Sequence, residues 1–336
     1  MDGPVFVTGG SGFVGGALID RLVAEGRSVR ALARSDPARR RVEELGATPV
    51  AGDVLDADGL VEVMRGCSTV FHAAGVSQIC IRDPRPMLRT NILGSANVLT
   101  EAARAGIGRL VYTSSAASIG ERKGTIGRED SPHRGWYLSS YERSKHLAER
   151  RMLALAEELD VDLVCVNPSS VQGPGRTHGS AQLLLRLANG RIPALIETTF
   201  SVIDVDDCSQ GHLLAEERGV RGERYVLSGA ALTVHEAISL LRTIAGRPDR
   251  VRFLPGWLAY AGASAIEVVA RPMRREAPVC RGAVRTLLHG HRYDGSRATR
   301  ELGLTYHAIE DTVERALRWY AERGLIRPIP PAGSPG

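Results

Sequence analysis

The segment TGGSGFVGG, residues 8–16, constrains the fold of this chain more than any other stretch of its sequence. It follows the β-rich run VFVTG at 5–9 and opens FVGGALIDRLVAEG at 13–26, where apolar residues recur at helical spacing. A glycine-rich turn between a first strand and a first helix is typical of a dinucleotide-binding site, whereas the glycine spacing alone also fits a turn without a ligand. We therefore expect a strand, a turn and a helix that together hold a dinucleotide.

Each glycine of this turn has a predicted role. Gly9 permits the tight turn, Gly12 lets the backbone approach a pyrophosphate, and Gly15 lets the helix pack closely against the strand. The helix N-terminus then presents unpaired N–H groups and the positive end of its dipole to phosphate. Phe13, the first residue of the helical pattern, belongs to the same predicted binding site.

The first half of the chain alternates β-rich runs with helical patterns. Further strands are expected at 28–34, 48–54, 69–75, 109–115 and 162–168, and helices at 58–66, 86–106 and 141–159. Strands that alternate with helices imply right-handed crossovers and a parallel sheet that is covered on both faces. The sequence therefore predicts an α/β fold with a doubly wound parallel sheet of the Rossmann type.

The pattern loosens after about residue 172, where a Gly-rich loop begins. The later elements are expected at 180–190, 201–219, 223–229, 232–246 (with a Thr cap and a final Gly246) and 307–324. We predict a Rossmann core at 1–172, a smaller and mainly substrate-binding lobe at 173–325 that is interwoven with the core, and a disordered Pro- and Gly-rich tail at 326–336. Ligands of such folds bind at the carboxyl edge of the sheet, where we expect this lobe to lie.

Composition excludes several classes of protein. The net charge is +5 for 336 residues, and acidic residues are spread among the arginines, so the basic stripe that nucleic acid requires is absent. The five cysteines are odd in number and scattered, without a C-x-x-C motif. This pattern predicts reduced thiols in a cytoplasmic protein, with neither a disulfide framework nor a metal site.

The apolar stretch WLAYAGASAIEVVA at 257–270 is too short for a membrane span and carries Glu267. We expect a buried helix or a helix that lines a substrate pocket, and the alternative is a helix that rests on a membrane surface. The N-terminus lacks a basic flank followed by an apolar run, so no signal peptide is predicted there.

The end of the second predicted strand indicates which dinucleotide binds. An acidic residue there would bind a ribose 2′-hydroxyl, whereas an arginine suits a 2′-phosphate. Arg34 occupies this position, and Asp36 comes two residues later. The sequence therefore favours NADP(H) over NAD(H), although Arg34 is also compatible with an ordinary solvated arginine in an arginine-rich chain.

Tyr141 and Lys145 stand four residues apart in YERSKHLAER, and Lys145 is one of only two lysines beside 41 arginines. Residues at this spacing share one face of a helix. An ammonium group near a phenol favours the phenolate, so Lys145 is expected to lower the pKa of Tyr141 and to let it exchange a proton at neutral pH. A compact ammonium also suits the two hydroxyls of a cofactor ribose better than a guanidinium does.

Three more polar residues complete the candidate catalytic group. Ser114 and Ser115 end the fifth predicted strand, at the edge that faces the cofactor in such folds. A hydroxyl there would polarise a substrate oxygen. Asn91, on the helix after the fourth strand, is a candidate to hold a water that relays protons to Lys145, and an ordinary polar residue of a helix is the alternative.

Together these residues resemble the extended short-chain dehydrogenase/reductases, also called the NAD-dependent epimerase/dehydratase family. The resemblance covers about residues 4–325 and rests on ordered blocks: TGGSGFVG, GDV, FHAAG, NILGSANVL, VYTSS, YERSK, NPSSVQGPG and IDVDD. It implies a catalytic group of Ser115, Tyr141, Lys145 and Asn91. It also implies cofactor contacts from Asp53, Val54, Ala73, Ala74, Gly75, Tyr141, Lys145, Pro168 and Val171.

Departures from the family pattern narrow the implied activity. Sugar 4,6-dehydratases place Asp-Glu after the Ser/Thr, where this chain has Ala116 and Ala117. Arg34 and the block FHAAGVSQICIRDP are similar to the dihydroflavonol 4-reductase branch, which implies an oxidoreductase for a ketone, aldehyde or secondary alcohol. The apolar character of 76–81, Trp136, Leu138 and 257–270 favours an apolar substrate.

Two other activities stay open at this point. A nucleotide-sugar 4-epimerase with tightly bound NAD needs only the same catalytic group, and a dinucleotide-sensing regulatory protein could use the fold without turnover. The family resemblance also implies a homodimer through the helices at 86–106 and 141–159.

Overall fold

The structure is a computed structural model that describes residues 3–192, 194–246 and 251–329. Its central sheet has seven parallel strands in the order β10-β6-β5-β4-β1-β2-β3. The strands are β1 (Val5–Thr8), β2 (Val29–Ala33), β3 (Thr48–Ala51), β4 (Thr69–His72), β5 (Arg109–Thr113), β6 (Leu163–Pro168) and β10 (Arg224–Leu227). The strand order reverses between β1 and β4, which is where a doubly wound sheet opens a ligand crevice. The predicted fold class is confirmed.

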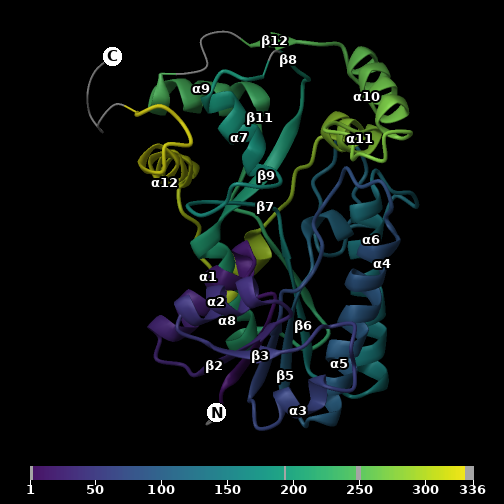
Figure 1. Cartoon of the computed structure of the whole chain (residues 1–336), viewed down its shortest axis with the longest axis vertical. Coiled ribbons are helices and arrows are strands. Elements are labelled where there is room, and N and C mark those ends of the chain that lie inside the picture. Colours follow the sequence, from purple (N-terminus) through teal and green to yellow (C-terminus); the bar gives the residue numbers. More distant parts are fainter. Residues whose placement is uncertain (1–2, 193, 247–250, 330–336) are drawn as a thin grey trace.

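Alternate residues of the strands face two layers of helices (Figure 1). Val5 and Val7 point into a core cluster with residues of α1 (Phe13–Ala24), α2 (Asp36–Glu44) and α8 (Val205–Arg218). Phe6 points into the opposite cluster, built with α3 (Leu60–Met64), α5 (Ser95–Arg104) and α6 (Ser140–Glu158). Every one of these three strand residues is fully buried, so the sheet is covered on both faces.

The second half of the chain builds a lobe above the carboxyl edge of the sheet (Figure 1). A three-stranded sheet in the order β11-β9-β7 connects it to the core. One cluster of the lobe contains residues of α7, α9 and α12, and a smaller one joins α10 and α11. The elements are β7 (Ser170–Gln172), α7 (Ala181–Ala188), β8 (Ala194–Leu195), β9 (Thr199–Asp204), β11 (Ala230–Thr233), α9 (Val234–Ala245), β12 (Arg252–Phe253), α10 (Gly256–Ala270), α11 (Arg281–His289), η3 (Ala298–Leu302) and α12 (Ile309–Glu322).

Elements from both sides of the predicted boundary at residue 172 share one core. Helix α8 and strand β10 return to the Rossmann sheet after the chain has begun the lobe. The division into a core and an interwoven lobe, with its boundary at 172, stays a prediction. The expected disordered tail at 326–336 lies mostly outside the described residues, which end at 329.

One expectation for a helix needs correction, and another is narrowed. The segment 86–106 is not one regular helix, because α4 (Arg85–Leu88) passes through a π-helical turn, η1 (Arg89–Gly94), into α5. The helix expected at 257–270, either buried or lining a substrate pocket, is α10, which buries only Ala263 and lines the large cavity with Leu258, Ala259 and Ile266 among others. The expected Thr cap and terminal glycine of α9 are confirmed: Thr233 and Glu236 form a capping box, and Gly246 ends the helix in the left-handed region. Within the described ranges, no helix has the length and apolar character that crossing a bilayer requires.

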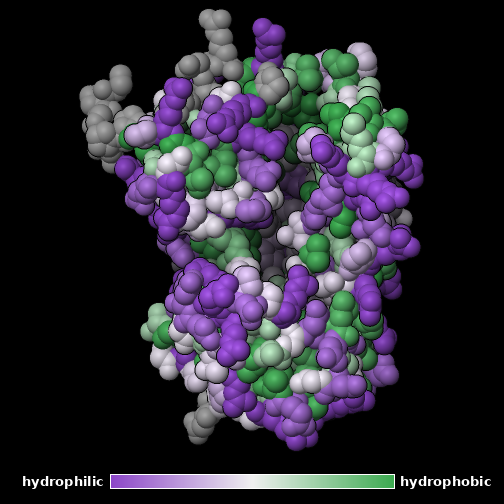
Figure 2. Space-filling model, in the orientation of Figure 1, coloured by the Kyte–Doolittle hydropathy of each residue, from purple (hydrophilic) through white to green (hydrophobic). Residues whose placement is uncertain are grey.

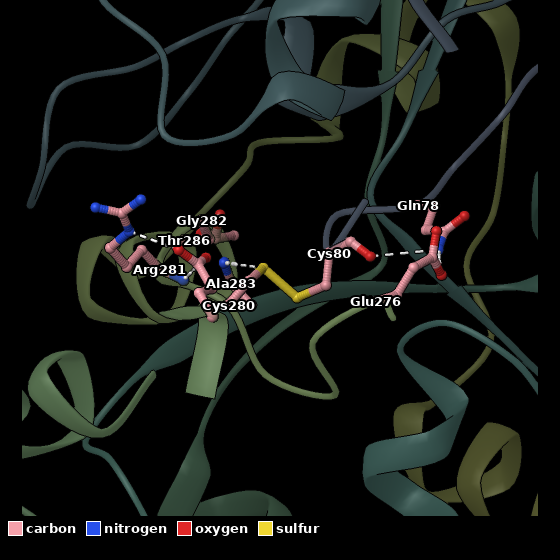
Figure 3. The surroundings of a disulfide bond; sticks show 9 residues. Gln78, Cys80, Glu276, Cys280, Arg281, Gly282, Ala283 and Thr286 are labelled. Carbon is pink, nitrogen blue, oxygen red and sulfur yellow. Dashed lines mark hydrogen bonds and ion pairs between the residues drawn. A yellow bond between two sulfur atoms is a disulfide. The ribbon is translucent and has the colours of Figure 1, made fainter. Parts of the chain in front are cut away.

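The prediction of five reduced thiols is wrong for two of them. Cys80, in the loop after β4, forms a disulfide with Cys280 at the start of α11 (Figure 3). The other three, Cys67, Cys165 and Cys208, are buried and free. The sequence spacing could not show this pairing, because 200 residues separate the two cysteines and only the folding of the lobe onto the core brings them together.

Candidate active site

A cavity of about 2400 Å³ lies between the carboxyl edge of the sheet and the lobe. Figure 2 shows the molecule hollowed at its centre, between the Rossmann core and the lobe above it. The sequence-predicted residues that line the cavity are Gly9, Gly12, Phe13, Gly15, Ala73, Gly75, Ser115, Tyr141, Lys145, Pro168 and Val171. The fold thus gathers most of the predicted site around one space.

The glycine turn fits the pyrophosphate of a dinucleotide. Gly9 has a φ of +75°, and a Cβ there would lie 2.6 Å from the backbone of Ala73 on the neighbouring strand. A Cβ on Gly15 would lie 2.2 Å from the carbonyl oxygen of Gly9. Side chains at these two positions would push the turn away from α1. The turn therefore leaves the N–H groups at the start of α1 open toward the cavity, as phosphate binding requires.

Arg176 was missed by the sequence analysis and lies beside this turn. It comes from the Gly-rich loop after β7, its guanidinium lies 5.5 Å from the ring centroid of Phe13, and it donates to the carbonyl of Val171. Burial lowers the pKa of its guanidinium. Arg176 thus brings a positive charge to the space between the glycine turn and Tyr141. The loop offered only its glycines as a signal, which predict a turn but not the direction of a side chain.

Tyr141 and Ser115 form the reacting end of the site. Tyr141 is in the first turn of α6, which Ser139 caps by accepting a hydrogen bond from the N–H of Glu142 at 3.2 Å. Ser115 follows β5, and its hydroxyl lies close enough to Tyr141 to favour the phenolate form of the tyrosine. Ser114 also lines the cavity, but its Oγ lies 3.5 Å from that of Ser118, and it is Ser115 that acts on the pKa of Tyr141. Of the two serines, Ser115 is therefore the one beside the phenol.

Lys145 lies one turn along α6 from Tyr141 and is buried. Its Nζ donates to the carbonyl of Thr113 at 2.9 Å and to the hydroxyl of Tyr112 at 3.3 Å. Burial lowers the pKa of the ammonium group to about 8, opposed by the charges of Glu149 and Cys165. The lysine is thus fixed against the end of β5.

The expected effect of Lys145 on Tyr141 is not what the structure shows. Burial raises the pKa of Tyr141, and the groups that oppose this rise are the Ser115 hydroxyl and the Arg176 guanidinium. Lys145 directs its charge to Tyr112 and Thr113 instead. In the protein without ligands, Tyr141 therefore keeps its proton at neutral pH.

A chain of buried polar groups continues behind Lys145. Tyr112 lies beside Ser95. The Oγ of Ser95 lies 2.8 Å from Nε2 of His72, and Nδ1 of His72 lies 2.7 Å from Oγ1 of Thr8. Burial, with a smaller contribution from the charge of Lys145, lowers the pKa of His72 to about 3, so this imidazole is neutral. The chain links Lys145 to the end of β1 and holds the carboxyl edges of three adjacent strands in register.

Asn91 is 1% exposed in the π-helical turn. Its Oδ1 accepts from the N–H of Val76 at 2.8 Å, and its Nδ2 donates to the carbonyl of Val76 at 3.0 Å and to Oγ of Ser144 at 2.8 Å. Both amide hydrogens are therefore engaged by protein. Asn91 fixes the loop after β4 against α6, beside Lys145.

Four predicted cofactor residues do not line the cavity, and two residues expected in the substrate pocket do not either. Arg34 is exposed just after β2. Asp53 accepts from the N–H of Leu55, Val54 is buried, and the N–H of Ala74 donates to Thr8. The two wrongly placed pocket residues are Trp136, which is 53% exposed under Arg134, and Leu138, which is buried.

The lobe completes the cavity with apolar side chains of α10 and α11 and with polar and charged residues, among them Arg186, Asp206 and Arg315. Loop residues 76–80 line it as expected, together with α10 and α11. His291 and Tyr293 line it beside them, with 3.0 Å between Nδ1 and the phenol oxygen. Nδ1 of His291 also lies 2.7 Å from the buried Glu121. A substrate in this cavity would therefore meet the apolar side chains of α10 and α11 and, beside them, the polar pair of His291 and Tyr293.

The fold and site together define a dinucleotide-binding enzyme with a Ser-Tyr-Lys group. The family model described as the NAD dependent epimerase/dehydratase family matches residues 5–228, and the chain belongs to this family. It is an NAD(P)-dependent oxidoreductase of the extended short-chain dehydrogenase/reductase type.

Individual proteins similar to this chain agree with that assignment. A Synechocystis sp. protein named "Putative dihydroflavonol 4-reductase" is 35% identical over 331 residues, with 96% of each chain covered. The 4-hydroxy-2-methyl-3-oxo-4-farnesyl-3,4-dihydroquinoline-1-oxide ketoreductase of Stigmatella aurantiaca is 34% identical over 306 residues, covering 89% of this chain and 90% of that protein. The crystal structure of gox2253 has a TM-score of 0.84 and 31% identity, covering 97% of this chain and 100% of that one.

Proposed function

We propose that this protein is an NADP(H)-dependent reductase that converts an apolar ketone or aldehyde into an alcohol, or performs the reverse oxidation. The observation that carries the proposal is the meeting of Ser115 and Tyr141 in the cavity, with Lys145 one helical turn further along α6. The glycine turn that would hold the cofactor opens into the same cavity.

The cofactor, bound along Gly9, Gly12 and Gly15, would supply the hydride to the carbonyl carbon. Ser115 donates a hydrogen bond to the carbonyl oxygen of the substrate and polarises it. Tyr141 carries its proton at neutral pH and gives it to the same oxygen as negative charge develops there. In the oxidation the phenolate must form, and Ser115 and Arg176 are the groups that favour it.

The proposed substrate is apolar because apolar side chains of α10 and α11 line the cavity. Ile79, Leu258, Ile266 and Leu287 are among the residues around the space next to Ser115 and Tyr141. The name of the Stigmatella aurantiaca relative describes a ketoreductase whose substrate carries a farnesyl group, which is also apolar. His291 and Tyr293 would meet the polar end of such a substrate.

Replacing Tyr141 by Phe tests the proposed chemistry. We expect turnover to fall by about 10²–10⁴-fold, because the phenol supplies the proton in the transition state. NADPH oxidation with a panel of apolar ketones and aldehydes measures it. Tyr137→Phe is the matched control, since Tyr137 lies four residues earlier, before α6, and its tilted ring contacts that of His133 outside the cavity. Full activity of the Tyr141→Phe protein would refute the mechanism.

The preference for NADP(H) rests on Arg34 at the end of β2. We expect calorimetry on the original chain to show tighter binding of NADPH than of NADH. Arg34→Ala should weaken NADPH binding by about tenfold, since one charged contact to the 2′-phosphate is lost, and leave NADH binding unchanged. A preference for NADH, or NAD that stays bound through purification, would instead support the epimerase alternative.

We also infer a homodimer through α5 and α6, the helices that the family resemblance implies. An exposed apolar side chain beside them, Leu93 at 46%, supports this. Light scattering of the purified chain tests it, and a monomeric mass would contradict it.

A further inference from the structure

Helix α10 has an unusual surface for a helix of a globular protein. Its sequence, GWLAYAGASAIEVVA, contains one charged residue, and a helix that is apolar on every side is normally buried. Here only Ala263 is buried. Trp257 is 73% exposed, Val268 71% and Val269 60%. The helix therefore lacks a partner for much of its apolar surface.

The two faces of α10 have different neighbours. Ala259, Gly262, Ala263 and Ile266 face the cavity, and Ala263 packs against α11 and β8 residues. At 100° per residue, Trp257, Ala261 and Val268 lie on the opposite side of the helix. Figure 2 shows apolar residues gathered at the upper right of the molecule, where Figure 1 places α10 and α11. The exposed apolar face thus backs directly onto the wall of the cavity.

Positive charge follows this face. Arg271, Arg274 and Arg275 come directly after α10, all are exposed, and none forms a salt bridge within the part of the chain that the structure describes. The two acidic residues nearby are engaged, since Glu267 pairs with Arg281 at 2.7 Å and Glu276 accepts from Gln78 at 2.5 Å. Met273, between these arginines, is 63% exposed.

We propose that the outward face of α10 and the three arginines after it dock this protein on the surface of a membrane that contains anionic lipids. A tryptophan, exposed aliphatic side chains and an adjacent arginine cluster are the features of a helix that lies in the membrane interface. The helix of 15 residues is about 22 Å long, too short to span the hydrocarbon core, so it lies in the plane of the surface.

A second copy of the chain fits this face less well. The outward side of one such helix offers roughly 200 Å², whereas a stable interface buries about 800 Å² on each partner. The unpaired arginines also favour an anionic partner over a like-charged copy. The docking does not depend on the proposed reductase activity, because it can be measured without substrate or cofactor.

Vesicle binding of the purified full-length chain tests the proposal. We expect the chain to sediment with vesicles of phosphatidylcholine and phosphatidylglycerol and to bind less to phosphatidylcholine alone, with weaker binding at high salt. Val268→Asp should weaken binding by about tenfold, because a charge enters the apolar face. Val220→Asp is the matched control, since Val220 is 56% exposed in the loop before β10, away from α10.

The arginines are tested in the same assay. The double variant Arg274→Ser, Arg275→Ser should bind the anionic vesicles about fivefold more weakly for each arginine removed. Its binding to phosphatidylcholine alone should change little. The double variant Arg39→Ser, Arg40→Ser removes equal charge from α2, on the far side of the molecule in Figure 1, and should bind as the original does.

Three results would overturn the proposal. The first is no preference for anionic vesicles in the original chain, and the second is equal loss of binding in the Val268→Asp and Val220→Asp variants. The third is a dimer that light scattering detects without lipid and that the Val268→Asp substitution converts to a monomer. This result would show that the outward face of α10 binds a second copy of the chain. Trp257→Ser gives an independent check if Val268→Asp does not fold.

Discussion

At the residue scale, the burial of the Lys145 ammonium group lowers the free energy of unfolding of the protein. Burial lowers the pKa of this ammonium group to about 8, from an ordinary value near 10.5. The unfolded chain therefore holds this proton up to a higher pH than the folded chain does. The resulting destabilisation is present in full below pH 8, and it disappears as the pH rises from about 8 toward 10, because the folded protein then carries a neutral amine.

We expect Lys145→Met to abolish activity yet stabilise the cofactor-free protein by about 2 kcal/mol at neutral pH. The pKa shift corresponds to about 3 kcal/mol, and the loss of the hydrogen bond to Thr113 offsets part of it. The gain should shrink between pH 8 and pH 10. Urea denaturation across this range measures the free energy of unfolding.

Lys123→Met is the control, because Lys123 is exposed and is the only other lysine of the chain. It should leave stability unchanged at each pH. A Lys145→Met protein that is less stable than the original at neutral pH, or a gain that is the same at every pH, would contradict this account.

The sequence was a good guide to some residues of the site and a poor guide to others. Tyr141 and Lys145 could be paired because a helix fixes the geometry of residues four apart. The glycine turn could be assigned because its spacing has a backbone reason. Arg176 could not, because an irregular loop gives no rule for side-chain direction. The pKa of Tyr141 depends on burial and on Arg176, neither of which the spacing contains.

At the scale of single elements, the π-helical turn η1 gives Asn91 its role. The turn places this amide between the loop after β4 and α6, where it makes two hydrogen bonds to Val76 and one to Ser144. A Cβ on Gly75, next to Val76, would lie 3.3 Å from Oδ1 of Asn91 and 3.9 Å from Nζ of Lys145. The amide therefore positions the backbone that borders Lys145, as π-helical turns at functional sites commonly do.

Asn91→Ala should reduce turnover by about 10- to 100-fold and the free energy of unfolding by about 2 kcal/mol, because the backbone groups of Val76 lose their partners. Steady-state kinetics and urea denaturation measure the two effects. Asn189→Ala removes an amide that bonds two carbonyls at the end of α7, far from Tyr141, and should leave turnover unchanged. Equal turnover in both variants would show that η1 has no part in the reaction.

Where the sequence misjudged an element, the apolar pattern did not match the way the element is buried. Helix α2 has one buried residue, Val42, in an arginine-rich segment, so its apolar pattern is too weak to read. The π-helical turn keeps the apolar pattern of an α-helix, so the sequence predicts one continuous helix at 86–106. Helix α10 is as apolar as a core helix, yet it lies at the surface with only Ala263 buried.

At the scale of the whole molecule, the sequence predicts that the strands of the core are parallel. It does not predict which segments of the lobe contact the core. Parallel order follows from the alternation of strands and helices. The contacts between the lobe and the core join segments far apart in the sequence, and the pair Cys80–Cys280 is the clearest case. This disulfide ties the loop after β4, which lines the cavity, to the first residue before α11 (Figure 3).

Opening this disulfide should loosen the lobe and lower the stability of the whole chain. A cross-link across 200 residues strongly restricts the unfolded chain. Such bonds contribute about 3 kcal/mol to the free energy of unfolding. For a chain of this length, their loss corresponds to a fall of about 4 °C in Tm. We expect a reductant to lower the Tm of the original chain by this amount. The Cys80→Ser variant should melt at the lower temperature whether or not reductant is present, since its other described thiols are already free. An original chain that melts at the same temperature with and without reductant would show that the bond does not hold the lobe to the core, and the walls of the cavity would then depend on packing alone.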